Sequence, residues 1–430
     1  MLIVKRFYNK ENFDFSTGYV DPFEFHKTCF MFLKAFQVWD GSKLTSYYRY
    51  LLKALILFCG MSALTILNLG FYHGLDTRDL PYMTEAGTYV LIMIYKLLIM
   101  SCTVLNLPDY HSLLRIIRED FQYVCDKGKI YRERFFQNQL QIWKICQISI
   151  VFLVCIALGM MIFSIASLIW YLKTHGSEIG TRPLPFPIWV PHVDIGKSPL
   201  YEVCLLYSNI CVVTYAINFI FMMQIQILWI GEIATKADLV IWSIEDLMNG
   251  IRPALNKQEE LYFSTLLKQR MQEIVKIHKS MIELMTSYAR VYTKLLMFEQ
   301  KVCAPVVCLS AYGILEKTGE INGILVILCI ATIISVFIPS CLCNFLSIKV
   351  SSICYACWNI PFWNATPVIR PYIVLIMQRS LRPLPIKASG FEEVSIETFS
   401  NVILHATTLF NSNSSTNSLI QKNLININTA

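Results

Sequence analysis

Long runs without a charged residue constrain this chain more than any other feature of its sequence. Ile145–Leu172, Val203–Gly231 and Ile321–Ile348 each lack Asp, Glu, Lys and Arg throughout. A helix crosses the hydrocarbon layer of a bilayer with about 20 apolar residues, so each run is long enough for a tilted span. Only 16% of the residues are charged, against roughly 25% in soluble domains. We therefore predict an all-α polytopic membrane protein.

Four further apolar stretches complete a predicted set of seven transmembrane helices. Three are Ala54–His73, Ala86–Leu107 and a span from about Val291 to Leu315, and the fourth is the last one, 393–412. The apolar run Pro371–Gln378 is too short to cross a bilayer. We interpret this run as the cytoplasmic half of a broken seventh helix, because an interrupted helix at membrane depth must be covered by protein or water.

The distribution of basic residues predicts which side of the membrane each loop occupies. Most of the 37 Lys and Arg residues lie in the segments 1–53, 107–144, 236–301 and 349–387. Because cytoplasmic loops are enriched in Lys and Arg, these segments and the N-terminus are predicted to be cytoplasmic. Seven spans then place the tail 413–430, which we expect to be disordered, outside the cell.

Two cytoplasmic segments are predicted to be ordered. Residues 1–43 carry many aromatic side chains, which favours docking on the bundle or at the membrane interface. The stretch between Pro253 and Pro305 contains no Gly or Pro, which favours one long helix within the loop 236–300. Its apolar residues recur at steps of four and three and predict a packing seam, with His278 as the polar member. The seam residues are Leu267, Met271, Ile274, His278, Met281, Met285, Tyr288, Tyr292 and Leu295.

The last predicted helix carries polar residues along one face. At helical spacing, Thr398, Asn401, His405, Thr408 and Ser412 fall on one stripe, opposite a mostly apolar side. Unpaired polar groups in hydrocarbon cost several kcal/mol, so the stripe must face protein or water. We interpret it as a pore lining. A polar seam inside the bundle and a helix lying on the membrane surface are the alternatives.

Charged residues inside predicted spans need an explanation of their own. Lys96 either lies buried beside a carboxylate such as Glu232 or Glu299, or extends to the cytoplasmic interface, and we favour the second interpretation. Glu299 and Lys301 imply that the fifth span is shielded from lipid by other helices. The proline-rich loop Lys173–Leu200 is predicted to be external, either as a lid over an outward-facing cavity or as a plain linker.

The sequence contains no pattern typical of an enzyme. It has no nucleophile elbow, phosphate-binding loop or paired carboxylates, and Cys354-x-x-Cys357 has no second cysteine pair to complete a zinc site. We therefore expect no catalytic activity, no cofactor or metal, and no nucleic-acid partner.

The layout of the chain resembles that of the insect odorant receptors. The most specific segment is Val394–Ser400, which is similar to that family's hydrophobic-Ser-Leu-acidic-x-Phe motif at the start of its last helix. The region Ile274–Met285 is similar as well. The resemblance implies an odorant-gated, non-selective cation channel in the plasma membrane of olfactory neuron dendrites. It also implies a heterotetramer with the odorant receptor co-receptor (Orco), joined through a cytoplasmic anchor that here includes 351–392.

The resemblance also implies where ligands and ions bind. A small volatile organic molecule would occupy the outer halves of helices two, three, four and six, within the bundle 1–350. Monovalent and divalent cations would pass acidic side chains at the inner mouth, Glu392, Glu393 and Glu397, and lipids would surround the bundle. The ligand-binding candidates are Tyr89, Met93, Met160, Phe163, Trp170, Tyr207 and Ile210.

The chain departs from the family pattern near its end. The family's Tyr in the last helix corresponds to Leu409, and the apolar gate positions correspond to Ser412, Ser415 and Thr416. The loop 236–300 lacks the large insertion of the co-receptor, so the chain resembles a tuning subunit. A gustatory receptor of the same superfamily, a metabotropic seven-helix receptor and a transporter are the alternatives. The metabotropic alternative conflicts with the predicted orientation and with the absence of Asp-Arg-Tyr and Asn-Pro-x-x-Tyr motifs.

Overall fold

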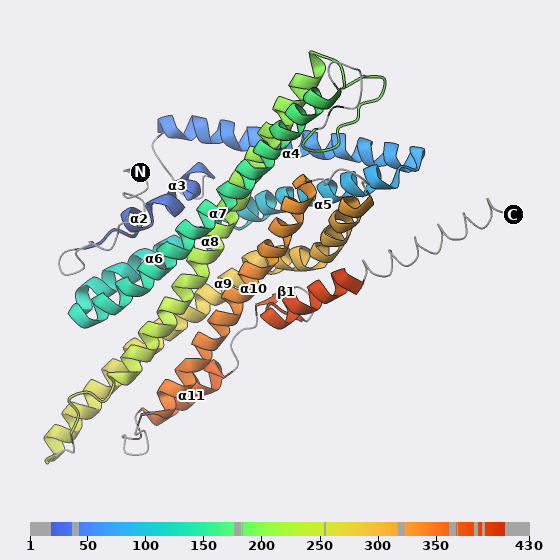
Figure 1. The fold of residues 1–430 in the computed structure, drawn as a ribbon. Helices are drawn as coiled ribbons and strands as arrows, with labels where there is room; N and C mark the ends of the chain where they lie inside the picture. The colour runs from blue at the N-terminus through green and yellow to red at the C-terminus, as the bar shows by residue number, and fades with distance from the viewer. Residues whose placement is uncertain are drawn as a thin grey trace.

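The structure is a computed structural model of the 430-residue chain, and it is nearly all helical (Figure 1). It describes residues 19–36, 43–175, 182, 184–252, 255–316, 323–360, 367, 369–381, 386–388 and 392–408. Within these residues, six helices are long and apolar enough to cross a membrane, which confirms the predicted polytopic fold and its first six spans. They are α4 (Lys43–Thr77), α5 (Leu80–Leu105), α7 (Lys129–His175), α8 (Leu200–Glu245), α9 (Lys257–Glu316) and α10 (Gly323–Trp358).

The tight turn between α4 and α5 follows from the residues around it. Asp79 precedes α5, and its Oδ1 accepts a hydrogen bond from the backbone N–H of Tyr82 at 3.1 Å, which caps the first helical turn. Pro81 follows in that turn, where no helical hydrogen bond is lost. A Cβ added to Gly74 would lie 3.1 Å from the Cα of Met83, so the glycine permits the close packing of the two helices.

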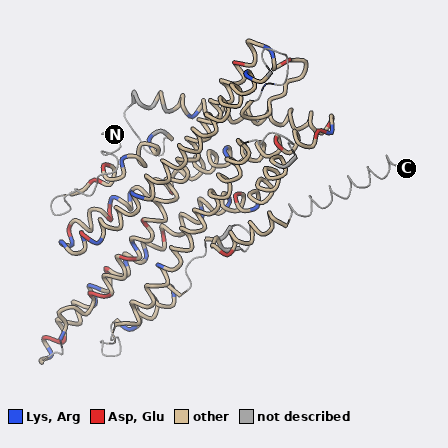
Figure 2. Tube along the Cα trace, in the orientation of Figure 1, with Lys and Arg blue, Asp and Glu red and all other residues tan. Residues whose placement is uncertain are grey.

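Helices α8 and α9 extend well beyond the rest of the bundle (Figure 1). They contain 46 and 60 residues, which corresponds to about 70 and 90 Å at 1.5 Å per residue. The hydrocarbon layer is only about 30 Å thick, so one end of each helix must project into water. Figure 2 shows Lys, Arg, Asp and Glu along that projecting end and along α6 (Leu107–Lys127). The predicted loop 236–300 thus includes the end of α8 and most of α9.

The predicted seam on α9 is buried along its length. Each of its apolar members is at most 2% exposed, and His278 is 7% exposed. Trp229 of α8 packs against this seam, with its ring centroid 5.9 Å from that of Tyr288 and 6.0 Å from that of Tyr292. Its indole N–H donates to the carbonyl of Leu284 at 3.2 Å. The spacing in the sequence therefore identified the contact face correctly.

The described part of the segment before the first span, residues 19–36, docks on the bundle, as its aromatic content predicts. It forms α2 (Pro22–Phe25) and α3 (Lys27–Ala35), and Phe25, Phe30 and Leu33 are all buried. Phe36 stacks on Phe221 of α8 with ring centroids 4.1 Å apart.

The C-terminal part of the chain contains the predicted break between two helices. Helix α11 (Arg370–Ser380) contains the short apolar run, and a further helix, here called the last helix, covers residues 396–408. Between them, β1 (Lys387–Ala388) pairs antiparallel with β2 (Glu392–Glu393). Glu392 and Glu393 therefore lie in a strand, and the last helix begins at residue 396, three residues after the predicted start at 393.

Candidate ligand cavity and last helix

A cavity lies inside the bundle, between α5, α7, α8, α9 and α10. It has a volume of about 80 Å³. Most of its wall is aliphatic or aromatic, which suits an apolar molecule of low molecular weight. The described lining residues are Leu91, Ile92, Tyr95, Leu153, Ile156, Ala157, Met160, Val212, Tyr215, Ala216, Phe219, Phe298, Glu299, Val302, Cys303, Val306, Leu328, Ala331, Thr332, Ser335 and Val336.

Aromatic stacking fixes one side of this cavity. Tyr95 and Phe298 are nearly parallel, with an interplanar angle of 5° and ring centroids 6.0 Å apart. Tyr215 and Phe219 stack at 6.0 Å and 8°. The phenol of Tyr95 donates to the Sδ of Met222 at 3.2 Å. These contacts join α5, α8 and α9 and hold the aromatic wall in one arrangement.

The ligand-binding residues predicted from the sequence are divided between three environments. Met160 lines the cavity. Tyr89 and Met93 do not line the cavity but belong to a buried apolar cluster that borders it, since Ile92, Val306 and Leu328 belong to both. Met160, Phe163 and Tyr207 pack against this cluster. The side chains of Trp170 and Ile210 are 62% and 39% exposed on the outside of the chain, away from the cavity. In a helix that is apolar all round, the sequence does not distinguish the lipid-facing side from the protein-facing side.

The proline-rich loop after α7 packs onto this apolar cluster. Phe186 is 2% exposed and belongs to the cluster. The phenol of Tyr89 donates to the carbonyl of Pro185 at 2.9 Å. Trp189 stacks on His73 of α4, with ring centroids 4.2 Å apart and an interplanar angle of 8°. The described part of the loop is therefore a packed cover over one end of the bundle.

The last helix packs through its apolar side and leaves its polar stripe uncovered. Ala406 is 2% exposed, and the Phe399 ring contacts that of Phe337 on α10. Asn401, His405 and Thr408 are exposed. Of the other two residues in the predicted stripe, Thr398 is half-buried and Ser412 lies outside the described residues. Glu397, which was predicted at the inner mouth, is exposed.

Local hydrogen bonds define the start of this helix. The backbone N–H of Thr398 donates to the Oγ of Ser395 at 3.2 Å, and the backbone N–H of Ser395 donates to the Oγ1 of Thr398 at 2.9 Å. This reciprocal pair satisfies two backbone donors that the first turn leaves free, as in a capping box. Thr398 therefore contributes to the helix terminus as well as to the polar stripe.

Lys96 is fully buried, so the prediction that it extends to the interface is wrong. Its exposure is 0%, and its Nζ donates to the Oγ1 of Thr214 on α8 at 3.0 Å. The Nδ2 of Asn218 donates to the Lys96 carbonyl at 3.0 Å. Within the described part of the chain, no ion pair joins Lys96 to Glu232 or Glu299. A hydroxyl group that lies 118 positions away replaces the carboxylate partner that the sequence suggested.

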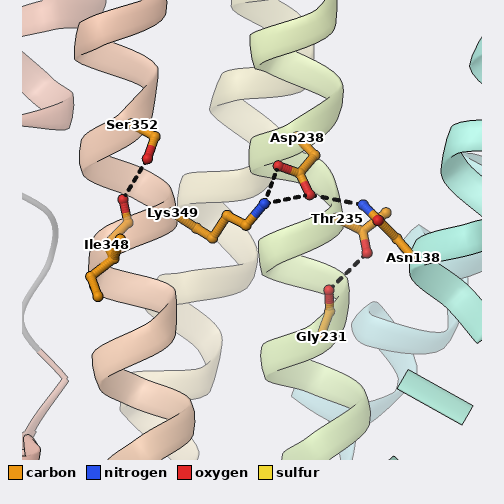
Figure 3. A network of polar contacts seen from close by, with 7 residues as sticks. All are labelled: Asn138, Gly231, Thr235, Asp238, Ile348, Lys349 and Ser352. Atoms are coloured by element: carbon orange, nitrogen blue, oxygen red, sulfur yellow. Dashed lines mark hydrogen bonds and ion pairs between the residues drawn. The ribbon is translucent and has the colours of Figure 1, made fainter. Parts of the chain in front are cut away.

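A charged cluster joins α7, α8 and α10 (Figure 3). The Nζ of Lys349 on α10 donates to both carboxylate oxygens of Asp238 on α8, at 2.8 and 3.1 Å. The Nδ2 of Asn138 on α7 donates to the same carboxylate at 2.8 Å. Sequence reasoning missed this cluster, because its members are about one hundred positions apart.

A second charged pair is more deeply buried. The Nζ of Lys236 donates to the Oδ1 of Asp120 at 2.8 Å and to the Oγ of Ser280 at 2.9 Å. The lysine and aspartate side chains are only 3% and 11% exposed. Burial raises the pKa of the Asp120 carboxyl above its ordinary value, and the adjacent ammonium group of Lys236 opposes that rise.

Comparisons with known proteins agree with this architecture. The chain matches the family model described as 7tm Odorant receptor over residues 79–406. It is similar to a structure of the insect olfactory receptor OR5 from Machilis hrabei in complex with eugenol. The TM-score is 0.72 at 15% identity, and the match covers 90% of this chain and 97% of that one.

A second structure of that receptor gives a TM-score of 0.70 at 14% identity, with coverage of 90% and 97%. At such identities, the likeness establishes the fold alone. No curated protein sequence matches the chain. Because the family model covers most of the sequence, the protein belongs to the seven-transmembrane odorant receptor family.

Proposed function

We propose that this protein is the tuning subunit of an odorant-gated, non-selective cation channel. It binds a small volatile organic ligand in the cavity of the bundle and opens a pore together with the shared co-receptor. Its place is the plasma membrane of olfactory neuron dendrites, with the N-terminus in the cytoplasm. It has no enzymatic role in this scheme.

One observation carries the proposal: α10 forms a wall of the cavity and also contacts the last helix. Val336 lines the cavity, and the ring of the adjacent Phe337 lies 5.3 Å from that of Phe399. A ligand favours the conformation to which it binds more tightly. A movement of α10 that improves the fit around the ligand therefore also moves the last helix.

The exposed polar stripe supports a pore-lining role for the last helix. Asn401, His405 and Thr408 would be unfavourable in contact with lipid, and four copies around a common axis would place them in water instead. Ser412 belongs to the same stripe. Glu397, with Glu392 and Glu393 before it, would provide negative charge at the inner mouth and concentrate monovalent and divalent cations.

The nature of the ligand and of the assembly is proposed from likeness and surface chemistry. The receptor OR5 from Machilis hrabei has been solved with eugenol, which supports a small organic ligand for this chain. The projecting ends of α8 and α9, with α11, would form the anchor to the co-receptor. Exposed apolar side chains on α7, such as Ile162, Ile169 and Trp170, suit contact with membrane lipids.

The decisive experiment is co-expression of the full chain with the co-receptor, while current is recorded against a panel of volatiles. We expect ligand-evoked cation currents that neither the co-receptor alone nor this chain alone produces. Currents from this chain alone would favour the gustatory type of channel. An N-terminal tag that antibodies reach on intact cells would support the metabotropic orientation, and the absence of any evoked conductance would refute the channel.

A further inference from the structure

The wall of the ligand cavity contains one buried carboxyl group. Glu299 of α9 lines the cavity and is 6% exposed. Its Oε1 has no hydrogen-bond partner within the described part of the chain. A buried polar atom without a partner costs about 1–3 kcal/mol, so a free acceptor in an otherwise apolar cavity calls for a functional explanation.

The other polar groups around the cavity already have partners or lack charge. The hydroxyl of Ser335 donates to the carbonyl of Thr332 at 2.7 Å, and that of Thr332 donates to the carbonyl of Leu328 at 2.9 Å. The Tyr95 hydroxyl donates to a thioether sulfur, and the hydroxyls of Tyr95 and Ser335 also interact with the carboxyl group of Glu299, so the oxygen without a partner is its Oε1 alone. No Lys, Arg or His is among the described lining residues. Glu299 is thus the only Asp or Glu there and has no cation beside it in the wall.

We propose that Glu299 selects ligands that carry a hydrogen-bond donor on an apolar body, namely volatile alcohols, phenols and amines. This inference rests on the proposed function, since it concerns the ligand of the same cavity. A carboxyl group accepts a hydrogen bond in both of its protonation states, because even the neutral acid retains a carbonyl oxygen. The rest of the wall accommodates the hydrocarbon part through apolar contact.

The same geometry accounts for discrimination against close analogues. An ether has nearly the shape of its parent alcohol but cannot donate to Glu299, so binding it would leave the buried oxygen without a partner. Sites built to satisfy a buried polar group reject analogues that lack the matching group far more strongly than apolar pockets reject a change in size. The preference should therefore appear as a ratio of half-maximal concentrations within a matched pair.

The test uses the full chain co-expressed with the co-receptor and a panel of matched pairs. Each pair joins a donor to its methylated or isomeric partner: 1-hexanol with 1-methoxypentane, and eugenol with its O-methyl ether. The expected result is activation by donor members at half-maximal concentrations lower on the order of 10-fold or more than those of their partners.

Variants then assign that preference to the carboxyl group. Glu299→Leu should bring the ratio within each alcohol or phenol pair close to one, whereas Glu299→Gln, which keeps a carbonyl oxygen, should preserve most of it. Glu283→Leu is the matched control, because Glu283 lies on the same helix with its side chain 59% exposed and forms an ion pair with Lys279 at the surface. Surface labelling of each variant confirms that it reaches the membrane.

Failure of this inference is distinguishable from failure of the proposed function. Activation of the wild-type channel only by members without a donor would overturn the role of Glu299 and leave the channel intact. An unchanged donor preference in a surface-expressed Glu299→Leu variant would do the same. If that variant does not reach the surface, the wild-type channel still tests the inference, because equal half-maximal concentrations for the two members of each pair would overturn it. A chain that responds to no volatile refutes the proposed function itself.

Discussion

Removal of one member of the buried Asp120–Lys236 pair offers the sharpest test of the packing described above. Lys236→Met deletes the ammonium group and keeps a flexible apolar side chain of similar length. The carboxylate of Asp120 then remains buried without its charge partner. Since the two side chains are only 3% and 11% exposed, solvent screens this loss poorly.

The magnitude follows from the cost of an uncompensated buried charge. Breaking a buried pair from one side typically costs about 3–5 kcal/mol, whereas replacing both members with apolar residues is often nearly neutral. We therefore expect Lys236→Met to destabilise the fold by about 3 kcal/mol or more. The double variant Asp120→Leu, Lys236→Met should recover most of that loss.

The loss of stability in Lys236→Met should also depend on pH, and the raised pKa of the Asp120 carboxyl determines the direction of that dependence. Burial raises the pKa of Asp120, and loss of the Lys236 cation removes the main opposing influence. A carboxyl whose pKa is higher in the folded state stabilises the fold when protonated, and that stabilisation is lost as pH rises through the folded-state pKa. The defect of Lys236→Met should accordingly be smaller at about pH 5 than at about pH 8.

The assay is thermal stability of the detergent-solubilised receptor, measured as the fraction that remains monodisperse after heating. Wild type, both single variants and the double variant form a thermodynamic cycle that isolates the interaction between the two residues. Equal loss in Lys236→Met and in the double variant would refute the reasoning. A defect in Lys236→Met that grows at acidic pH would refute the assigned sign.

Three further predictions address gating, the pore and the charged cluster. Phe337→Ala should raise the half-maximal ligand concentration several-fold without loss of surface expression, and an unchanged dose response would exclude this contact from the coupling path. His405→Cys should make the open channel sensitive to a charged thiol reagent, whereas Val402→Cys on the other side of the last helix should not; equal sensitivity of both would argue against a pore-lining stripe. Lys349→Met should lower the stability of the fold by about 1–3 kcal/mol, because it leaves the largely buried Asp238 carboxylate with fewer hydrogen-bond donors. A stability equal to that of wild type would show that the cluster does not stabilise the fold.

The first six spans and the α9 seam were predictable because they depend on properties that lie close together in the sequence. An uncharged run is visible without knowledge of its neighbours, and a seam at steps of four and three follows from helix geometry. The shielding of Glu299 was also predicted correctly, since a carboxyl group in a span must face protein. Lys301, only two positions further, is exposed in the described chain.

The residues that line the cavity could not be predicted to the same degree. Trp170 and Ile210 satisfy the composition of a ligand pocket but lie on the outer surface, because α7 and α8 are apolar on every side. Glu299 was predicted to be shielded from lipid and was considered as a partner of Lys96, but its position in the cavity wall was not predicted, since that position depends on five helices meeting at one depth. Strand β2 before the last helix was missed because two paired residues are too short to show an alternating pattern.

The prolines within α9 and α10 have a mechanical consequence. Helix α9 continues through Pro305 and α10 through Pro339, and each proline lacks the N–H that would complete its helical turn. Val306 and Val336 of the cavity wall lie within one turn of these prolines. From Pro305 to Lys257, α9 measures about 70 Å, so a pivot of about 2° at the proline displaces the far end by about 2 Å. A small pivot beside the candidate cavity is thus converted into a larger displacement at the far end of α9.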